Sequence, residues 1–189
     1  MYAKVENNVI VKANSSLASF NRAAPSWSAE QLAANGIYEV VYDNSNLKDD
    51  RFYINGAESF TFANDTVTAS YTAAVGKALD DVNATDENDV ELDPVVVISG
   101  VKSIEKNQIK AQAASLLQST DWYVVRNAES STAVPANVST YRTAVRTKSN
   151  EMETAIDGAA SIEALEALFT YTTGADDVTS RPLGEWPKL

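Results

Sequence analysis

The sequence predicts an α+β fold, with a small antiparallel β-rich N-terminal domain followed by a C-terminal helical hairpin and a short third helix. In the first part of the chain, short runs of β-branched and aromatic residues alternate with turns that contain Asn, Asp or Gly, which is typical of strands. After residue 101, apolar residues recur at the spacing of amphipathic helices. We expect four segments: a β-rich domain at 1–79, an acidic linker with a short apolar strand at 80–100, a helical hairpin domain at 101–170 and an extended tail at 171–189.

The first 42 residues carry signals for a hairpin, a helix and a strand. Residues 2–12 alternate loosely around Asn7-Asn8, and Asn in this position favours a hairpin turn. A short helix is expected to begin within 25–32, with Ser26 or Ser28 as its N-cap, and to end at Asn35-Gly36. A strand is expected at 37–42.

Three further short strands are expected before residue 72. They are predicted at 52–54, 59–62 and 66–71, with turns at Asn55-Gly56 and Asn64-Asp65. The large aromatic residues of this region are the expected core of the N-terminal domain, and they are Trp27, Tyr38, Phe60 and Phe62.

The segment 80–93 is strongly acidic. It holds seven acidic residues and no basic one: Asp80, Asp81, Asp86, Glu87, Asp89, Glu91 and Asp93. Because it lacks the glycine turn and the ligand spacing of a calcium loop, we expect a solvated linker and no metal site. The β-branched run 95–98 is expected to be buried, either as an added strand of the N-terminal sheet or paired with a strand of a partner.

The first arm of the helical hairpin is expected to end near Ser119. Its apolar stripe consists of Ile109, Ala113, Leu116 and Leu117. Trp122 is expected to be a buried pin that holds a turn against both helices, followed by β-prone residues at 123–125 and a loop at 127–133.

The second arm begins at Pro135, which suits the first turn of a helix. Its apolar seam has heptad-like spacing and consists of Val138, Tyr141, Val145, Met152 and Ile156. This seam is either internal core or a surface for self-association. Arg142 and Arg146 lie beside it, either as a solvated face that pairs with nearby acids or as a grip on an acidic partner. A short helix is expected at 161–169, with Ser161 as its N-cap.

Composition argues against several classes of function. The 189-residue chain has 15 basic and 26 acidic residues and a net charge of −11, so we expect no nucleic-acid binding. No apolar run is long enough for a membrane span, and the first residues lack a signal-peptide layout. Since Cys and His are both absent, we expect no zinc site, no cofactor and no enzymatic activity.

One segment, 104–156, resembles a known family. The order of its motifs is similar to that in the C-terminal region of bacteriophage tail-fibre assembly proteins and tail assembly chaperones, in the form found in phages of marine bacteria. The motifs that carry the resemblance are Leu116-Leu117, Thr120-Asp121-Trp122, Pro135, Tyr141-Arg142 and Arg146.

The resemblance implies an assembly factor, a chaperone that binds a tail-fibre or tail protein through its helical half. It implies action in the host cytoplasm during assembly, and a place in the virion tail if the complex persists. The alternative is a permanent virion component, such as a fibre-associated or baseplate adaptor protein. A homo-oligomer is compatible with either function. Trp186 either folds back on the domain or is offered to a partner. The candidate partner-binding residues are Trp122, Tyr123, Tyr141, Arg142, Arg146 and Trp186.

Overall fold

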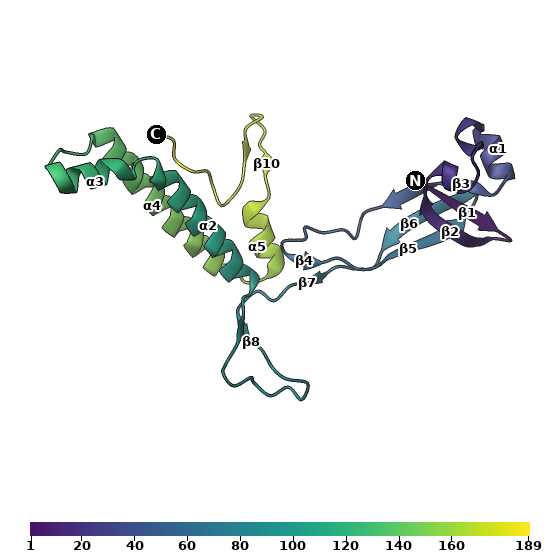
Figure 1. The fold of residues 1–189 in the computed structure, drawn as a ribbon, viewed down its shortest axis with the longest axis horizontal. Coiled ribbons are helices and arrows are strands. Elements are labelled where there is room, and N and C mark those ends of the chain that lie inside the picture. The colour runs from purple at the N-terminus through teal and green to yellow at the C-terminus, as the bar shows by residue number, and fades with distance from the viewer. The chain divides into compact units, whose positions relative to one another are not determined.

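The computed structural model describes residues 1–189 and divides into two compact units, Met1–Val75 and Gly76–Leu189. Most strands lie in the first unit and all the longer helices lie in the second, which confirms the predicted α+β class (Figure 1). The boundary precedes the acidic segment 80–93. That segment is therefore part of the second unit and does not separate the two.

The first unit is built on a five-stranded sheet with the order β2-β1-β3-β6-β5. Its strands are β1 (Tyr2–Glu6), β2 (Val9–Ser15), β3 (Ile37–Asp43), β5 (Glu58–Ala63) and β6 (Thr66–Tyr71). The sheet was expected to be antiparallel, but it is mixed. β3 and β6 pair in parallel, with Val40 opposite Val67. The sheet curls, and its two edge strands β2 and β5 approach each other.

Two of the three predicted turns close hairpins. Asn7 and Asn8 join β1 to β2, and Asn64 and Asp65 join β5 to β6, all four with positive φ. Positive φ at both central residues gives the turn whose twist matches a right-handed hairpin. These residue types adopt that conformation readily.

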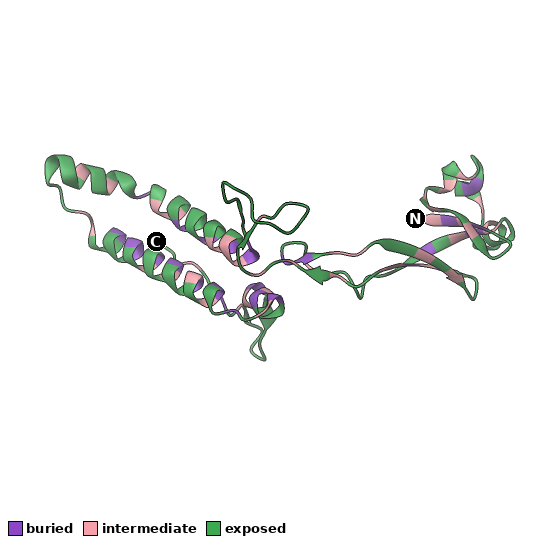
Figure 2. Ribbon diagram, turned by 90° about the horizontal axis from the view of Figure 1, so that it is seen from below, coloured by how far each residue is buried: buried purple, intermediate pink, exposed green.

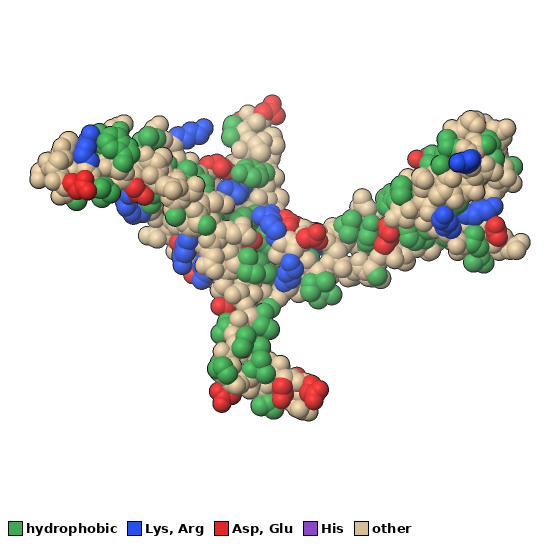
Figure 3. Space-filling view, in the orientation of Figure 1, with side chains coloured by type: hydrophobic (Ala, Val, Ile, Leu, Met, Phe, Trp, Pro, Cys, Tyr) green, Lys and Arg blue, Asp and Glu red, His purple; other side chains and the backbone are tan.

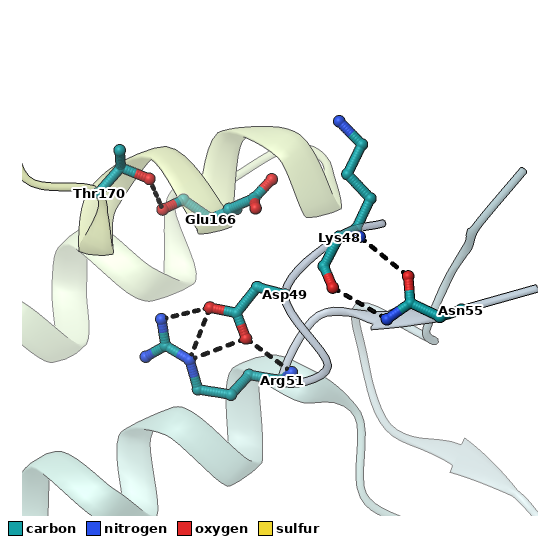
Figure 4. Close-up of polar contacts among 6 residues, drawn as sticks. All are labelled: Lys48, Asp49, Arg51, Asn55, Glu166 and Thr170. Atoms are coloured by element: carbon teal, nitrogen blue, oxygen red, sulfur yellow. Dashed lines mark hydrogen bonds and ion pairs between the residues drawn. The ribbon is translucent and has the colours of Figure 1, made fainter. Parts of the chain in front are cut away.

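The third predicted turn, Asn55-Gly56, does not form a hairpin. β4 (Tyr53–Ile54) instead pairs with β7 (Val75–Gly76). The side chain of Asn55 accepts a hydrogen bond from the Lys48 amide and donates one to the Lys48 carbonyl, both at 2.9 Å (Figure 4). Gly56 lies so close to Thr72 that a Cβ would come within 2.0 Å of the Thr72 hydroxyl oxygen. Asn55 therefore closes the loop that begins at Lys48, and Gly56 allows the chain to pass close to Thr72.

Small residues form the buried cluster of the sheet, and three of the four expected aromatic residues surround it. Phe52 of the first unit is also fully buried, outside this cluster. The buried cluster consists of Ala3, Val5, Val40, Val67 and Ala69. Tyr38, Phe60 and Phe62 pack against this cluster while half-buried, with 4.8 Å between the ring centroids of Tyr38 and Phe62. Trp27 is also half-buried but lies outside the cluster.

A short helical region connects β2 to β3. It contains two 3₁₀ turns, η1 (Leu17–Ser19) and η2 (Ala24–Ser26), and the helix α1 (Ala29–Ala34). Ser28 and Gln31 form a reciprocal capping box at the start of α1. The predicted helix is thus confirmed, with Ser28 as its N-cap.

The second unit is organised by two paired helices. Its helices are α2 (Val101–Gln118), α3 (Asp121–Ser130), α4 (Ala136–Asp157) and α5 (Ile162–Phe169). α2 packs along α4, and the whole predicted seam from Val138 to Ile156 is buried, which makes the seam internal core. The Ser161 hydroxyl accepts a hydrogen bond from the Ala164 amide, as expected of an N-cap. No helix combines the length and the apolar character that crossing a membrane requires.

Two short hairpins complete the second unit. β8 (Val82–Asn83) pairs with β9 (Val97–Ile98), and β10 (Thr172–Thr173) pairs with β11 (Thr179–Ser180). The run 95–98 is exposed, so its expected burial is wrong within this chain. The tail is not extended, since it forms the second of these hairpins and then buries Leu183.

Candidate partner-binding surface

The corner between α2 and α3 is held by an arginine from α4. Thr120 occupies this corner and is buried. Arg142 Nη1 donates to the Leu117 carbonyl at 2.9 Å and to the Thr120 hydroxyl oxygen at 2.7 Å. Arg142 Nη2 forms an ion pair with the Asp121 carboxylate at 2.8 Å. One guanidinium group thus joins the end of α2, the corner and the start of α3.

The position of Arg142 agrees with one part of its predicted role and contradicts the rest. It pairs with a nearby acid, Asp121, as expected, but its side chain is only 9% exposed. It therefore belongs neither to a solvated helix face nor to a grip on an acidic partner. The neighbouring Tyr141 is buried as well, in a cluster with Ala113 and Val145. Its hydroxyl donates to the Leu116 carbonyl over 3.4 Å, a long hydrogen bond. Both residues act inside the helical hairpin.

Trp122 lies in the first turn of α3 and faces solvent. The segment 121–130 is helical throughout, so the predicted turn, β-prone run and loop are wrong here. Trp122 is 51% exposed and is not a buried pin. Figure 2 shows α3 as a mostly exposed helix, and none of its residues is buried.

We define the aromatic turn as residues 122–125, which are Trp122, Tyr123, Val124 and Val125. The rings of Trp122 and Tyr123 stack with centroids 3.8 Å apart and a tilt of 31°. The Arg126 guanidinium lies 4.7 Å from the Trp122 ring centroid and 5.3 Å from that of Tyr123. This cation–π contact fixes both rings at the surface.

The aromatic turn presents apolar side chains in every direction around its helix. Successive residues of an α-helix are about 100° apart, so four in a row cover the full circumference. Trp122, Val124 and Val125 are exposed, and Tyr123 is half-buried. The residues of α3 that follow are mostly polar, so these four form a local exposed apolar cluster. The arrangement suits the binding of an apolar partner surface.

Arg146 and Trp186 have different environments. Arg146 is exposed, and its Nη1 makes only a 3.5 Å contact with the Arg142 carbonyl. Trp186 folds back onto the α2–α4 pair, where it packs against the cluster around Val145 and donates to Gln112 Oε1 at 2.9 Å. Trp186 is therefore part of the hairpin's packing, and Arg146 remains a surface cation.

The structure thus divides the six predicted site residues into two groups. Trp122, Tyr123 and Arg146 lie at or near the surface, whereas Tyr141, Arg142 and Trp186 make internal contacts. Sequence reasoning missed Arg126. The spacing of four residues between Trp122 and Arg126 could have indicated their contact, but only once the segment was recognised as a helix.

A surface hollow runs along the outer side of α4. Small polar side chains dominate its lining, which consists of Ser139, Thr140, Thr143, Ala144, Thr147, Lys148, Glu151 and Pro187. Lys148 and Glu151 pair with each other at 3.6 Å across one helical turn. No cluster of three or more His, Cys, Asp or Glu side chains is placed to hold a metal ion.

No protein-family model, curated protein or solved structure matches the chain. The resemblance of residues 104–156 to phage tail-fibre assembly proteins therefore stays a prediction. The exposed apolar surfaces of the second unit are the observations that bear on function.

Proposed function

We propose that the chain is a bacteriophage tail assembly factor, a chaperone that binds a tail-fibre or tail protein through its helical half. The aromatic turn is the observation that carries this proposal. Binding energy at protein interfaces concentrates in Trp, Tyr and Arg residues, and Trp122, Tyr123 and Arg126 form one such group. Because their rings are already stacked in the free chain, little ordering is needed when a partner binds.

The proposed binding surface has rigid support. The α2–α4 pair is packed along a continuous buried seam, and Arg142 fixes the direction in which α3 leaves it. A partner therefore meets a preformed surface and not a flexible segment. The net charge of −11 favours partners with basic surfaces and limits association between copies of the chain. The chaperone would act in the host cytoplasm, where the tail proteins are made.

A permanent virion component of the tail, such as a fibre-associated or baseplate adaptor protein, is the second candidate. It is favoured by exposed apolar residues outside the aromatic turn, such as Val97 in β9 and Val178, which precedes β11. Obligate interfaces are larger and more apolar than transient ones, so several separate apolar segments suit a permanent assembly.

Quantitative mass spectrometry of purified mature particles tests the two candidates against each other. A fixed copy number that is a multiple of three or six supports a virion component on a symmetric tail or fibre. Absence from particles, with abundance in the infected lysate, supports a chaperone that departs.

A binding measurement tests the proposal itself. The full chain is co-expressed with each tail-fibre and tail protein of the same phage and purified through that protein. We expect Trp122→Ala to abolish co-purification with one of them, and Val41→Ala, an equally exposed position on β3, to preserve it. If no fibre or tail protein binds the wild-type chain, the assembly function is refuted.

A further inference from the structure

The hairpin at residues 82–98, which we name the acidic arm, has a firmly built base. The Val101 amide donates to the Ala78 carbonyl at 2.9 Å, and the Lys102 amide donates to the Leu79 carbonyl at 3.1 Å. The Gly100 amide donates to Asp81 Oδ1 at 2.8 Å. A Cβ on Gly100 would lie 2.3 Å from the Asp80 carbonyl carbon, so only glycine permits this approach. The arm therefore leaves the start of α2 from a fixed position.

The arm has ordered internal structure. The Ala84 amide donates to the Val96 carbonyl at 2.7 Å, and the Ala84 carbonyl accepts from the Leu92 amide at 3.1 Å. At the tip, Asp86 Oδ1 accepts from the Asn88 amide at 2.8 Å and from the Val90 amide at 3.0 Å. A solvated linker would not contain these bonds, so the expected linker is a folded hairpin.

Apolar side chains cover both faces of the arm. Six of them are between 46% and 59% exposed: Val82, Val90, Val95, Val96, Val97 and Ile98. Because side chains alternate along a strand, β9 places Val97 and Ile98 on opposite faces. Strands with this pattern are normally buried on both sides. A two-stranded ribbon alone is at best marginally stable in water. The apolar side chains of the arm therefore have no protein packed against them, although their pattern is that of a buried strand.

The charge of the arm indicates which kind of protein packs against its apolar side chains. The arm has five acidic side chains, and none of them forms an ion pair with Lys or Arg. They are Asp86, Glu87, Asp89, Glu91 and Asp93. Figure 3 shows acidic side chains at the end of the arm and hydrophobic ones along it. Most basic side chains of the second unit already pair with carboxylates, and these are Lys102, Lys106, Lys110, Arg142, Lys148 and Arg181. The chain as a whole has 15 basic and 26 acidic residues, so a second copy presents more negative than positive charge to the arm.

We propose that the acidic arm is a second docking element, which inserts into an apolar cleft of a basic protein partner. The valines and Ile98 contact the floor of the cleft. The carboxylates at the tip meet Lys and Arg at its rim. Long-range attraction between opposite charges speeds such encounters, and like charge disfavours self-association. The arm and the aromatic turn are separate segments, so the inference does not depend on which protein the aromatic turn binds.

The test uses the full chain and a fluorescent probe peptide of about ten residues that alternates Val and Lys, long enough for one strand. A Val–Glu peptide of equal length is the control probe. We expect saturable binding of the Val–Lys peptide, weakened at least about tenfold when NaCl rises from about 50 mM to about 500 mM. Hydrogen exchange should show new protection confined to residues 82–98.

Two pairs of variants separate the contributions of apolar surface and charge. Val95→Thr/Val97→Thr should weaken binding, whereas Val41→Thr on β3, which is similarly exposed, should leave it unchanged. Glu87→Gln/Asp89→Asn should also weaken binding, with Asp176→Asn/Asp177→Asn in the other hairpin of the second unit as its control.

Three results would overturn the proposal. One is equal affinity for the Val–Lys and Val–Glu peptides. Another is binding that the arm variants leave unchanged. The third is arm-dependent dimerisation in analytical ultracentrifugation, which would make a second copy the occupant. None of these bears on the binding of a tail protein to the aromatic turn, so failure here and failure of the proposed function are distinguishable.

Discussion

Arg142 and Thr120 form a 2.7 Å hydrogen bond across 22 residues of sequence, which connects α4 to the corner between α2 and α3. The same guanidinium group also binds the Leu117 carbonyl and the Asp121 carboxylate. The last carbonyl groups of a helix have no partner within that helix and must find one elsewhere. Arg142 supplies one of these partners and at the same time fixes the start of α3.

Replacement of Arg142 should therefore destabilise the helical hairpin. We expect Arg142→Ala to lower the free energy of unfolding by about 1.5–3 kcal/mol, because it removes the charge-assisted hydrogen bonds to Leu117 and Thr120 together with the ion pair to Asp121. Arg142→Lys should recover only part of this loss, since an ammonium group cannot reproduce the planar guanidinium fork. Urea unfolding measures both. Arg146→Ala, one turn further along α4 and exposed, is the control and should stay within about 0.5 kcal/mol of wild type. Equal losses for Arg142→Ala and Arg146→Ala would contradict this role.

Trp122 should contribute little to folding despite its size. Because the ring is half exposed, we expect Trp122→Ala to change the free energy of unfolding by less than about 1 kcal/mol. Met152→Ala, at a fully buried position on α4, should cost about 2–5 kcal/mol. Thermal unfolding of the two variants gives the comparison. A loss at Trp122 as large as that at Met152 would mean that the ring is buried in solution.

The Trp186 contact predicts that the tail stabilises the α2–α4 pair. Trp186→Ala should lower the free energy of unfolding by about 1–3 kcal/mol, since it exposes apolar surface around Val145 and leaves Gln112 without its indole donor. It should also make the last residues more accessible to carboxypeptidase. Val178→Ala, an exposed position in the same tail, is the matched control and should behave as wild type. Unchanged stability of the Trp186 variant would show that the fold-back is not maintained in solution.

Local signals predicted much of the fold. The turns at Asn7-Asn8 and Asn64-Asp65 formed because Asn and Asp accept positive φ wherever two strands meet in register. The same chemistry at Asn55-Gly56 served a different purpose, because the side chain of Asn55 bonds to Lys48 and β4 pairs with β7. A turn signal identifies a bend but not the strand partner, which depends on contacts distant in sequence. The parallel pairing of β3 with β6 has the same origin.

The candidate site was less predictable, because burial there depends on tertiary contacts. Trp122 and Arg142 were assigned by residue type, the tryptophan as buried and the arginine as exposed or partner-binding. The structure reverses both, since Arg142 reaches buried acceptors at the corner while the Trp122 side chain is 51% exposed. The residue that best indicated the reversal is Asp121, whose carboxylate both suits the start of a helix and pairs with Arg142.

The base of the acidic arm should respond to pH through Asp81. The hydrogen bond from the Gly100 amide, assisted by the Ser103 hydroxyl, lowers the pKa of the Asp81 carboxyl. Because this pKa is lower in the folded than in the unfolded chain, the carboxylate's contribution to stability is present above the ordinary pKa of about 3.9 and is lost as the pH falls through the folded-state value. An NMR titration of the Gly100 amide should therefore have its midpoint below about 3.9. Asp81→Asn should remove the transition. A midpoint at or above the ordinary value would show that the Gly100–Asp81 bond does not hold the arm in solution.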